Sequence, residues 1–116
     1  MENSELKKSK PFTIAKTLEY MPHSVVMKTI TRKTTGNIIT FSFDSGEMLT
    51  EKISPFDTFI QIIDGKAEIF IDDESHSLDT GESIIIPAHS RNIIKANVRF
   101  KMLSTTIKSG YEDIVI

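Results

Sequence analysis

The stretch GEMLTEKISPFDTFIQIIDG, residues 46–65, decides the fold. It begins and ends with glycine, and between the glycines it is rich in Ile, Phe and Thr, which favour β-strands. Its last two residues, Asp64-Gly65, separate two such runs in TFIQIIDGKAEIFI, residues 58–71. Because Asp-Gly supplies the positive φ angles of a two-residue turn, this stretch predicts a tight β-hairpin at Asp64-Gly65.

A second stretch, GESIIIPAHSRNIIKA, residues 81–96, continues the strand pattern. The period of two along a strand places Asn92, Ile94 and Ala96 on one inward face. In the next strand the same period separates a core side from a solvent side. The residues predicted to face the core are Val98, Phe100 and Met102, and those predicted to face solvent are Asn97, Arg99 and Lys101. Two neighbouring strands with one buried face each are therefore predicted.

Turn-forming residues divide the chain from Val25 onward into further short strands. They are Thr35-Gly36-Asn37, Asp44-Ser45-Gly46, Asp72-Asp73 and Asp79-Thr80-Gly81. The run Ser83-Ile84-Ile85-Ile86 breaks the alternation, which predicts a strand covered on both sides, either within the monomer or by a partner subunit. Many short strands between turns predict an all-β, double-sheet jelly roll.

The composition limits the classes of function. A chain of 116 residues with 39% hydrophobic residues forms one domain. The chain has no cysteine, which excludes disulfides, thiolate nucleophiles and Cys-ligated metals. A net charge of −2 gives no positive surface for a phosphate backbone, so we expect no nucleic-acid partner. No apolar run reaches the roughly 20 residues that span a bilayer, and MENSELKKSK lacks the apolar region of a secretory signal. We expect a soluble, cytoplasmic protein with no membrane partner.

We divide the chain into three parts. They are an N-terminal arm and lead-in segment (residues 1–22), a β-barrel domain (23–108) and a C-terminal tail (109–116). In the lead-in segment, Ile14, Leu18 and Met21 follow helical spacing, although an extended segment pinned to the barrel would also fit. The tail carries Tyr111 and the apolar end Ile114-Val115-Ile116, which predicts an added edge strand, docking on a partner subunit, or a frayed end.

The spacing of Gly46, Gly65, Gly81 and Pro87 resembles the two motifs of the cupin superfamily. The first motif reads Gly, five residues, His, one, His, three or four, Glu, six, Gly. The second reads Gly, five residues, Pro, one, Gly, two, His, three, Asn. The resemblance is to small single-domain cupins of the cupin 2 type and covers residues 38–107. It implies a double-stranded β-helix, or jelly-roll barrel, with a pocket at its wider end. It also implies, in many relatives, a homodimer and an Fe, Mn, Zn or Ni ion held by three His and one Glu.

At the ligand positions of these motifs the chain departs from the family. Lys52, Ser54 and Thr58 stand at the first three, and Asn92 takes the His position of the second motif. An ammonium, two hydroxyls and an amide form a poor cation site, so we expect no bound metal and no cofactor. The same groups suit an anionic or polyhydroxylated small molecule. His89, on the loop after Pro87, replaces the motif's glycine and is a further candidate for ligand binding.

Three functions are compatible with these residues. The first is a metal-free cupin that binds a small molecule through Lys52, Ser54, Thr58, His89 and Asn92. The second is an enzyme, in which Lys52 is the catalytic base of an isomerase or lyase, or in which His89 and Asn92 form a remodelled metal site. For Lys52 the alternative is a side chain that reaches solvent. The third is a dimerisation or sensory module, and in each case we expect a homodimer.

Overall fold

A computed structural model describes residues 5–51 and 53–108 of the chain. Apart from one short 3-10 helix, η1 (Ile14–Lys16), the regular structure in these residues is antiparallel β-sheet. The strands are β1 (Val25–Lys33), β2 (Gly36–Phe43), β3 (Met48–Glu51), β4 (Thr58–Ile71), β5 (Glu74–Asp79), β6 (Ser83–Ile86), β7 (Asn92–Lys95) and β8 (Phe100–Ile107). No helix in this part of the chain is long and apolar enough to cross a membrane.

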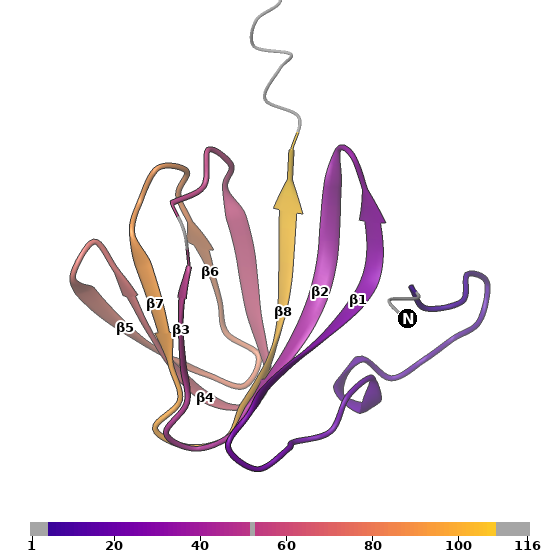
Figure 1. The fold of residues 1–116 in the computed structure, drawn as a ribbon, viewed down its shortest axis with the longest axis horizontal. Coiled ribbons are helices and arrows are strands. Elements are labelled where there is room, and N and C mark those ends of the chain that lie inside the picture. Colours follow the sequence, from indigo (N-terminus) through magenta and orange to yellow (C-terminus); the bar gives the residue numbers. More distant parts are fainter. Residues whose placement is uncertain (1–4, 52, 109–116) are drawn as a thin grey trace, which may run out of the picture.

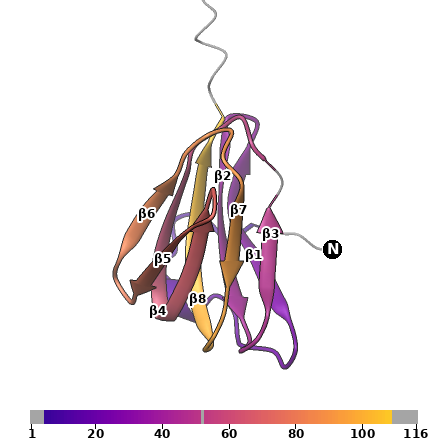
Figure 2. The same ribbon diagram turned by 90° about the vertical axis from the view of Figure 1, so that its left-hand side faces the viewer.

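One long strand, β4, runs through both halves of the sheet, which curls into a barrel (Figure 1). Its first half pairs with β6 and β8, and its second half pairs with β5 and β7. In the view turned by 90°, β5 and β6 lie beside β4 (Figure 2). The strands lie close together at the end where β4 passes from one half of the sheet to the other. They spread apart toward a wider mouth at the opposite end (Figure 1). The all-β jelly-roll barrel predicted from the sequence is confirmed.

The hairpin predicted at Asp64-Gly65 is wrong. Strand β4 continues through both residues, and its pairing with β8 shifts register between Ile62 and Asp64. Gly65 does have a positive φ of 86°, but here this angle forms a bulge at which the strand bends from one half of the sheet to the other. The turn lies instead at Asp72-Asp73, where both residues have positive φ and join β4 to β5.

Inward-facing apolar side chains fill the narrow end of the barrel. Phe43 at the end of β2 and Phe100 at the start of β8 stack with ring centroids 4.5 Å apart, and both are fully buried. The alternation predicted for Asn92, Ile94 and Ala96 is confirmed, because all three are buried. For Val98 the predicted burial is wrong, since β8 begins only at Phe100 and Val98 is half exposed.

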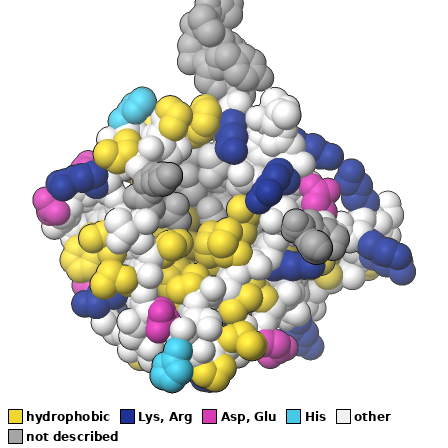
Figure 3. Space-filling view, in the orientation of Figure 1, with side chains coloured by type: hydrophobic (Ala, Val, Ile, Leu, Met, Phe, Trp, Pro, Cys, Tyr) yellow, Lys and Arg dark blue, Asp and Glu magenta, His cyan; other side chains and the backbone are white. Residues whose placement is uncertain are grey.

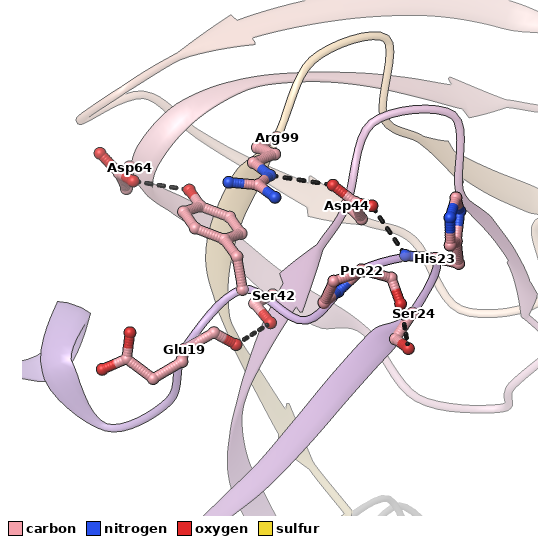
Figure 4. Close-up of polar contacts among 9 residues, drawn as sticks. Glu19, Pro22, His23, Ser24, Ser42, Asp44, Asp64 and Arg99 are labelled. Atoms are coloured by element: carbon pink, nitrogen blue, oxygen red, sulfur yellow. Dashed lines mark hydrogen bonds and ion pairs between the residues drawn. The ribbon is translucent and has the colours of Figure 1, made fainter.

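The outer face of β2 and β8 is covered by the lead-in segment. Thr40 and Ser42, which point outward from β2, are fully buried. The Ser42 hydroxyl donates to the backbone oxygen of Glu19 over 2.9 Å (Figure 4). Lys101 is buried as well, and its Nζ donates to the backbone oxygen of Ala15 over 2.6 Å. The predicted solvent position of Lys101 is therefore wrong, because residues distant in sequence cover it.

The lead-in segment is extended rather than helical beyond η1, as one of the two alternatives predicted. Leu18 is buried, whereas Met21 is half exposed and does not join it in an apolar stripe. The hydroxyl of Tyr20 donates to Asp64 over 2.6 Å, and the guanidinium carbon of Arg99 lies 5.3 Å from the Tyr20 ring centroid. Burial, and then the hydrogen bond to Asp64, raise the pKa of Tyr20. This segment is thus pinned across the outside of the barrel.

Candidate functional site

A cavity of about 340 Å³ occupies the wider end of the barrel. It is lined by Met27, Asn37, Ile39, Phe41, Leu49, Ser54, Phe56, Thr58, Ile60, Ile86, Pro87, Ser90, Asn92, Ile94, Met102, Ser104 and Thr106. Every described lining residue is uncharged, and the polar ones carry only hydroxyl or amide groups. Figure 3 shows that hydrophobic side chains are gathered in the middle of the face viewed in Figure 1. A cavity with apolar walls and a few polar groups has the usual composition of a small-molecule site.

Polar and apolar residues are sorted by depth in this cavity because the strands are in register. At the mouth, Thr106 of β8 pairs with Asn37 of β2 and with Thr58 of β4. Two residues further in, Ser104 lies between Ile39 and Ile60. Deeper still, Met102 lies between Phe41 and Ile62. Since residues two apart on a strand share one face, the walls change from polar at the mouth to apolar at the base.

The loops at the mouth are tied to each other by hydrogen bonds that backbone amides donate. The amide of His89 donates to the backbone oxygen of Ser54 over 2.7 Å, and the amide of Ala88 donates to Asp57 Oδ1 over 2.8 Å. Within the second loop, the hydroxyl of Ser90 donates to the backbone oxygen of Pro87 over 2.6 Å. Asp57 thus fixes the position of the loop that contains Ala88. These bonds hold the mouth in a preformed shape.

The structure brings together three of the five residues predicted for ligand binding. Ser54, Thr58 and Asn92 line the cavity. His89 is exposed and is not among the lining residues. Its φ of 66° lies in the left-handed region, which explains why the family motif has glycine at this position. Lys52, also predicted as the catalytic residue, lies outside the described residues.

The described groups at the motif's ligand positions do not fit a transition metal. The Ser54 hydroxyl is engaged with the backbone of Phe56, and the Thr58 hydroxyl lies 3.2 Å from that of Thr106. Imidazole and carboxylate groups, which these metals prefer, are missing from the cavity lining that the structure describes. Over residues 5–51 and 53–108 as a whole, no group of three or more His, Asp or Glu side chains is placed to hold a metal ion.

Asn92 is the unusual polar residue of the cavity. It is the first residue of β7, it is only 8% exposed, and it lies on the inward face above Ile94. Its side-chain oxygen, Oδ1, is fully buried without a hydrogen-bond partner, and no other buried side-chain oxygen or nitrogen of the described residues is in this state. Buried polar groups in native proteins are nearly always hydrogen-bonded, so an unpaired one is exceptional.

Several cavity residues were missed by the sequence analysis. Asn37, Ser104 and Thr106 line the polar part of the cavity but lie on β2 and β8, outside both motifs. When the alternation predicted for Phe100 and Met102 is continued along the same strand, it predicts that Ser104 and Thr106 also face inward. Ser90 lies inside the second motif but at a position with no assigned role, so the motif gave no signal for it.

No protein-family model and no curated protein sequence matches the chain. Solved structures do. A conserved protein of unknown function from Streptococcus pyogenes superposes with a TM-score of 0.85 at 25% identity, over 94% of this chain and 96% of that one. A cupin superfamily protein from Desulfitobacterium hafniense gives a TM-score of 0.84 at 28% identity, over 94% and 100% of the two chains. A cupin 2 conserved barrel domain protein from Leptotrichia buccalis gives 0.81 at 28% identity, over 84% of this chain and 47% of that one.

These similarities agree with the positions of the motif residues. Gly46, Gly65 and Gly81 all have positive φ, which is the conformation that makes glycine suitable at each of them. The curled sheet and the pocket at the wider end are those that the resemblance to cupins implied. The fold, the glycine and proline spacing and the solved relatives together show that the chain has the barrel fold of small cupins.

Proposed function

We propose that this cupin binds a small organic molecule in the barrel cavity without the help of a transition metal. The observation that carries the proposal is the cavity itself, in which uncharged polar side chains at the mouth lie above an apolar base. Such a site suits a ligand with one polar and one apolar part. Hydrogen bonds between the mouth loops also support it, because a preformed site loses little freedom on binding.

The sequence predicted an anionic or polyhydroxylated ligand. Hydroxyl and amide groups such as those of Thr58, Thr106 and Asn92 favour the polyhydroxylated class, because each can adapt to a hydroxyl partner. The anionic class depends on Lys52, which lies outside the described residues. An enzymatic function with Lys52 as the base remains a prediction. The cytoplasmic location also remains a prediction.

The proposal is tested by filling the cavity. Ser104 lies inward between Ile39 and Ile60 and is 9% exposed, so Ser104→Phe places a ring in the cavity. Thermal shift against a library of neutral and anionic hydroxylated molecules is expected to give hits with the wild type that disappear in Ser104→Phe. Thr50→Phe is the matched control, because Thr50 is exposed on the outward side of β3 and its change leaves the cavity open.

Two results would contradict this function. One is a library without a single hit. The other is a set of hits that persists unchanged in Ser104→Phe, which would place binding elsewhere. Circular dichroism shows whether the variants are folded, and Ser104→Leu, with a smaller side chain, replaces the Phe variant if the ring prevents folding.

We also propose that the predicted homodimer forms through the outer face of β4, β6 and β8. A groove of about 470 Å³ on this face is lined by Pro55, Phe56, Asp57, Phe59, Ile85, Ala88, Thr105 and Ile107. Ile85 is 59% exposed and Ile107 is 66% exposed. The sequence predicted that the run containing Ile85 is covered on both sides, either by the same chain or by a partner. Since the described residues leave Ile85 uncovered, a second copy is the occupant that we assign to this face.

A further inference from the structure

We propose that the basic side of the molecule, formed by the start of the lead-in segment and the tip of the β1–β2 hairpin, is a docking surface for an anionic phospholipid membrane. This inference goes beyond the proposed small-molecule function and does not depend on it. It is carried by the uneven distribution of charge along the chain. Residues 5–33 hold seven basic and two acidic side chains, a net charge of +5, although the whole chain carries −2.

Hydrogen bonds hold the start of the lead-in segment against the end of β1. The amide of Leu6 donates to the backbone oxygen of Ile30 over 3.2 Å, and the amide of Arg32 donates to the carboxylate of Glu5. The lysines that follow Leu6 in sequence therefore lie near Arg32 and Lys33, the basic residues at the end of β1.

The end of β8 brings a further lysine to the same region. The amide of Lys108 donates to the backbone oxygen of Thr35, in the turn between β1 and β2, over 2.7 Å. Figure 3 shows Lys and Arg side chains gathered over the right-hand side of the molecule, where β1 and the lead-in segment lie in Figure 1. Five of the six residues are exposed, and Lys108 is half-buried. We call this group the basic patch, and it consists of Lys7, Lys8, Lys10, Arg32, Lys33 and Lys108.

An exposed aromatic side chain adjoins the lysines of the patch. Every residue from Lys7 to Phe12 is exposed, and Phe12 itself is 50% exposed. A positive φ of 67° at Ser9 marks a turn between Lys8 and Lys10. Clusters of four to eight Lys or Arg residues are typical of segments that bind anionic lipids, and an apolar ring beside them can enter the boundary between headgroups and acyl chains.

A lipid surface fits this combination better than a nucleic acid does. The phosphates of a duplex would attract the same cations, but they offer no hydrocarbon for Phe12. We expected no membrane partner because no apolar run spans a bilayer, but contact with one leaflet needs no such run. The proposed partner is therefore the surface of an anionic bilayer.

The opposite side of the barrel is acidic, and this contrast sets the orientation of docking. Strand β5 lies on the far side from β1 (Figure 1). The turns on either side of β5 carry exposed carboxylates, those of Asp72, Asp73, Glu74, Asp79 and Glu82. An anionic surface repels these groups and attracts the basic patch, so the protein approaches it with the lead-in segment first.

Acidic residues outside the described range do not outweigh the patch. Those that adjoin it in sequence are Glu2, Glu112 and Asp113. Even if all three lay beside the patch together with Glu5, four negative charges would face six positive ones. The patch would stay positive.

Flotation of the full-length protein with lipid vesicles tests the inference. We expect binding to vesicles made of equal parts of phosphatidylglycerol and phosphatidylcholine, and no binding to pure phosphatidylcholine. Binding should weaken as the salt concentration is raised from about 0.05 M to about 0.5 M, because screening shortens the range of the attraction.

Two sets of substitutions separate the patch from the net charge. Each cation near an anionic surface strengthens binding about fivefold, so the loss of three should weaken it at least about tenfold. The test variant combines Lys7→Gln, Lys8→Gln and Lys10→Gln. The control removes the same charge from the far side of the barrel and should bind as the wild type does. It combines Lys66→Gln, Arg91→Gln and Lys95→Gln.

The contribution of the aromatic ring is tested separately. Phe12→Ser should weaken binding to anionic vesicles several-fold at low and at high salt, because the burial of a ring is not screened. Met21→Ser is the matched control, since Met21 is 51% exposed in the same segment but lies outside the patch. All the substituted residues lie at the surface, and circular dichroism shows that each variant is folded.

Three results would overturn the inference. The first is a wild type that does not float with anionic vesicles. The second is an equal loss of binding in the two triple variants, which would mean that only net charge matters. The third is release of the protein from vesicles by an equal mass of duplex DNA that Phe12→Ser binds as tightly as the wild type, which would assign the patch to nucleic acid. Ser104→Phe should float as the wild type does, so failure here leaves the proposed cavity function untouched.

Discussion

Asp44 joins three parts of the chain through one carboxylate. Its Oδ1 accepts a hydrogen bond from Arg99 Nε over 2.9 Å, and its Oδ2 accepts one from the backbone amide of His23 over 2.7 Å (Figure 4). The Arg99 hydrogen bond, followed by that from His23, lowers the pKa of Asp44 from its ordinary 3.8 to about 2. Asp44 therefore ties the turn before β1 and the loop before β8 to the end of β2.

The stability contribution of Asp44 is expected to depend on pH. Because its pKa is lower in the folded protein than in the unfolded chain, the contribution is complete above pH 3.8 and is lost as the pH falls through about 2. Asp44→Asn should therefore be less stable than the wild type at about pH 5, and the difference should shrink by about pH 2. Urea unfolding of both proteins at each pH measures it. A difference that does not change with pH would mean that the charge of Asp44 contributes nothing.

Asn92 and Ser90 allow a paired test of buried hydrogen bonding at the mouth. Both residues are less than a tenth exposed, but only the Ser90 hydroxyl has a partner, the Pro87 backbone oxygen. Asn92→Leu is expected to raise the free energy of unfolding by about 1 kcal/mol, because it removes an unpaired buried acceptor. Ser90→Ala should lower it by about 1 kcal/mol, because it breaks a bond that exists. Denaturant unfolding of the ligand-free protein gives both values, and a loss of stability in Asn92→Leu would refute the unpaired state.

At the scale of the elements, β4 depends on the bulge at Gly65. A Cβ atom at this position would lie only 2.2 Å from the backbone oxygen of Arg99, and the φ of 86° is itself unfavourable for other residues. Gly81 has a similar φ of 91°, but the space around it is open. The two glycines thus share a backbone conformation and differ in crowding.

This difference predicts unequal costs for the same substitution. Gly81→Ala is expected to lower the free energy of unfolding by about 1 kcal/mol, which is the cost of the left-handed conformation alone. Gly65→Ala adds a clash with backbone that cannot move freely, so it should cost at least about 3 kcal/mol. Thermal or denaturant unfolding of the two variants is the measurement. Equal losses would show that the bulge at Gly65 can open without cost.

The sequence could predict which segments form β-strands, but it could not predict which strands pair with one another. Asp64-Gly65 has the better turn chemistry, yet only Asp72-Asp73 makes a turn. Asp64-Gly65 lies in a strand whose two halves have different neighbours, which is a tertiary property. The burial of Lys101 was missed for the same reason, because the segment around Ala15 that covers it is far away in sequence.

The sequence could predict those residues of the candidate site that lie within the two motifs. Ser54, Thr58 and Asn92 were identified from the resemblance to the cupin motifs, and all three line the cavity. Thr106 and Asn37 were not, because β8 and β2 carry no motif and enter the cavity through their pairing with other strands. The unpaired state of Asn92 Oδ1 depends on the orientation of every neighbouring hydrogen-bond donor, so no sequence pattern predicts it.

At the scale of the whole molecule, the outer face of β4, β6 and β8 is the surface assigned to a second copy. Ile85→Lys places a charge in the middle of this apolar face, and we expect it to turn a dimer into a monomer because a desolvated, unpaired charge is costly. Light scattering coupled to gel filtration measures the mass. Val98→Lys is the control, since Val98 is also an exposed apolar residue but lies in the loop before β8. A wild type that is monomeric, or a variant that stays dimeric, would contradict the assignment.

The central position of β8 has a consequence for how the chain is made. This strand is the last of the eight to leave the ribosome, yet it belongs between β2 and β4, which are separated until it arrives. A nascent chain that still lacks residues 100–107 therefore exposes two long open edges, and open edges recruit other chains. The barrel of this protein can close only once β8 has emerged, and the interval before then is when its polypeptide most needs protection by chaperones.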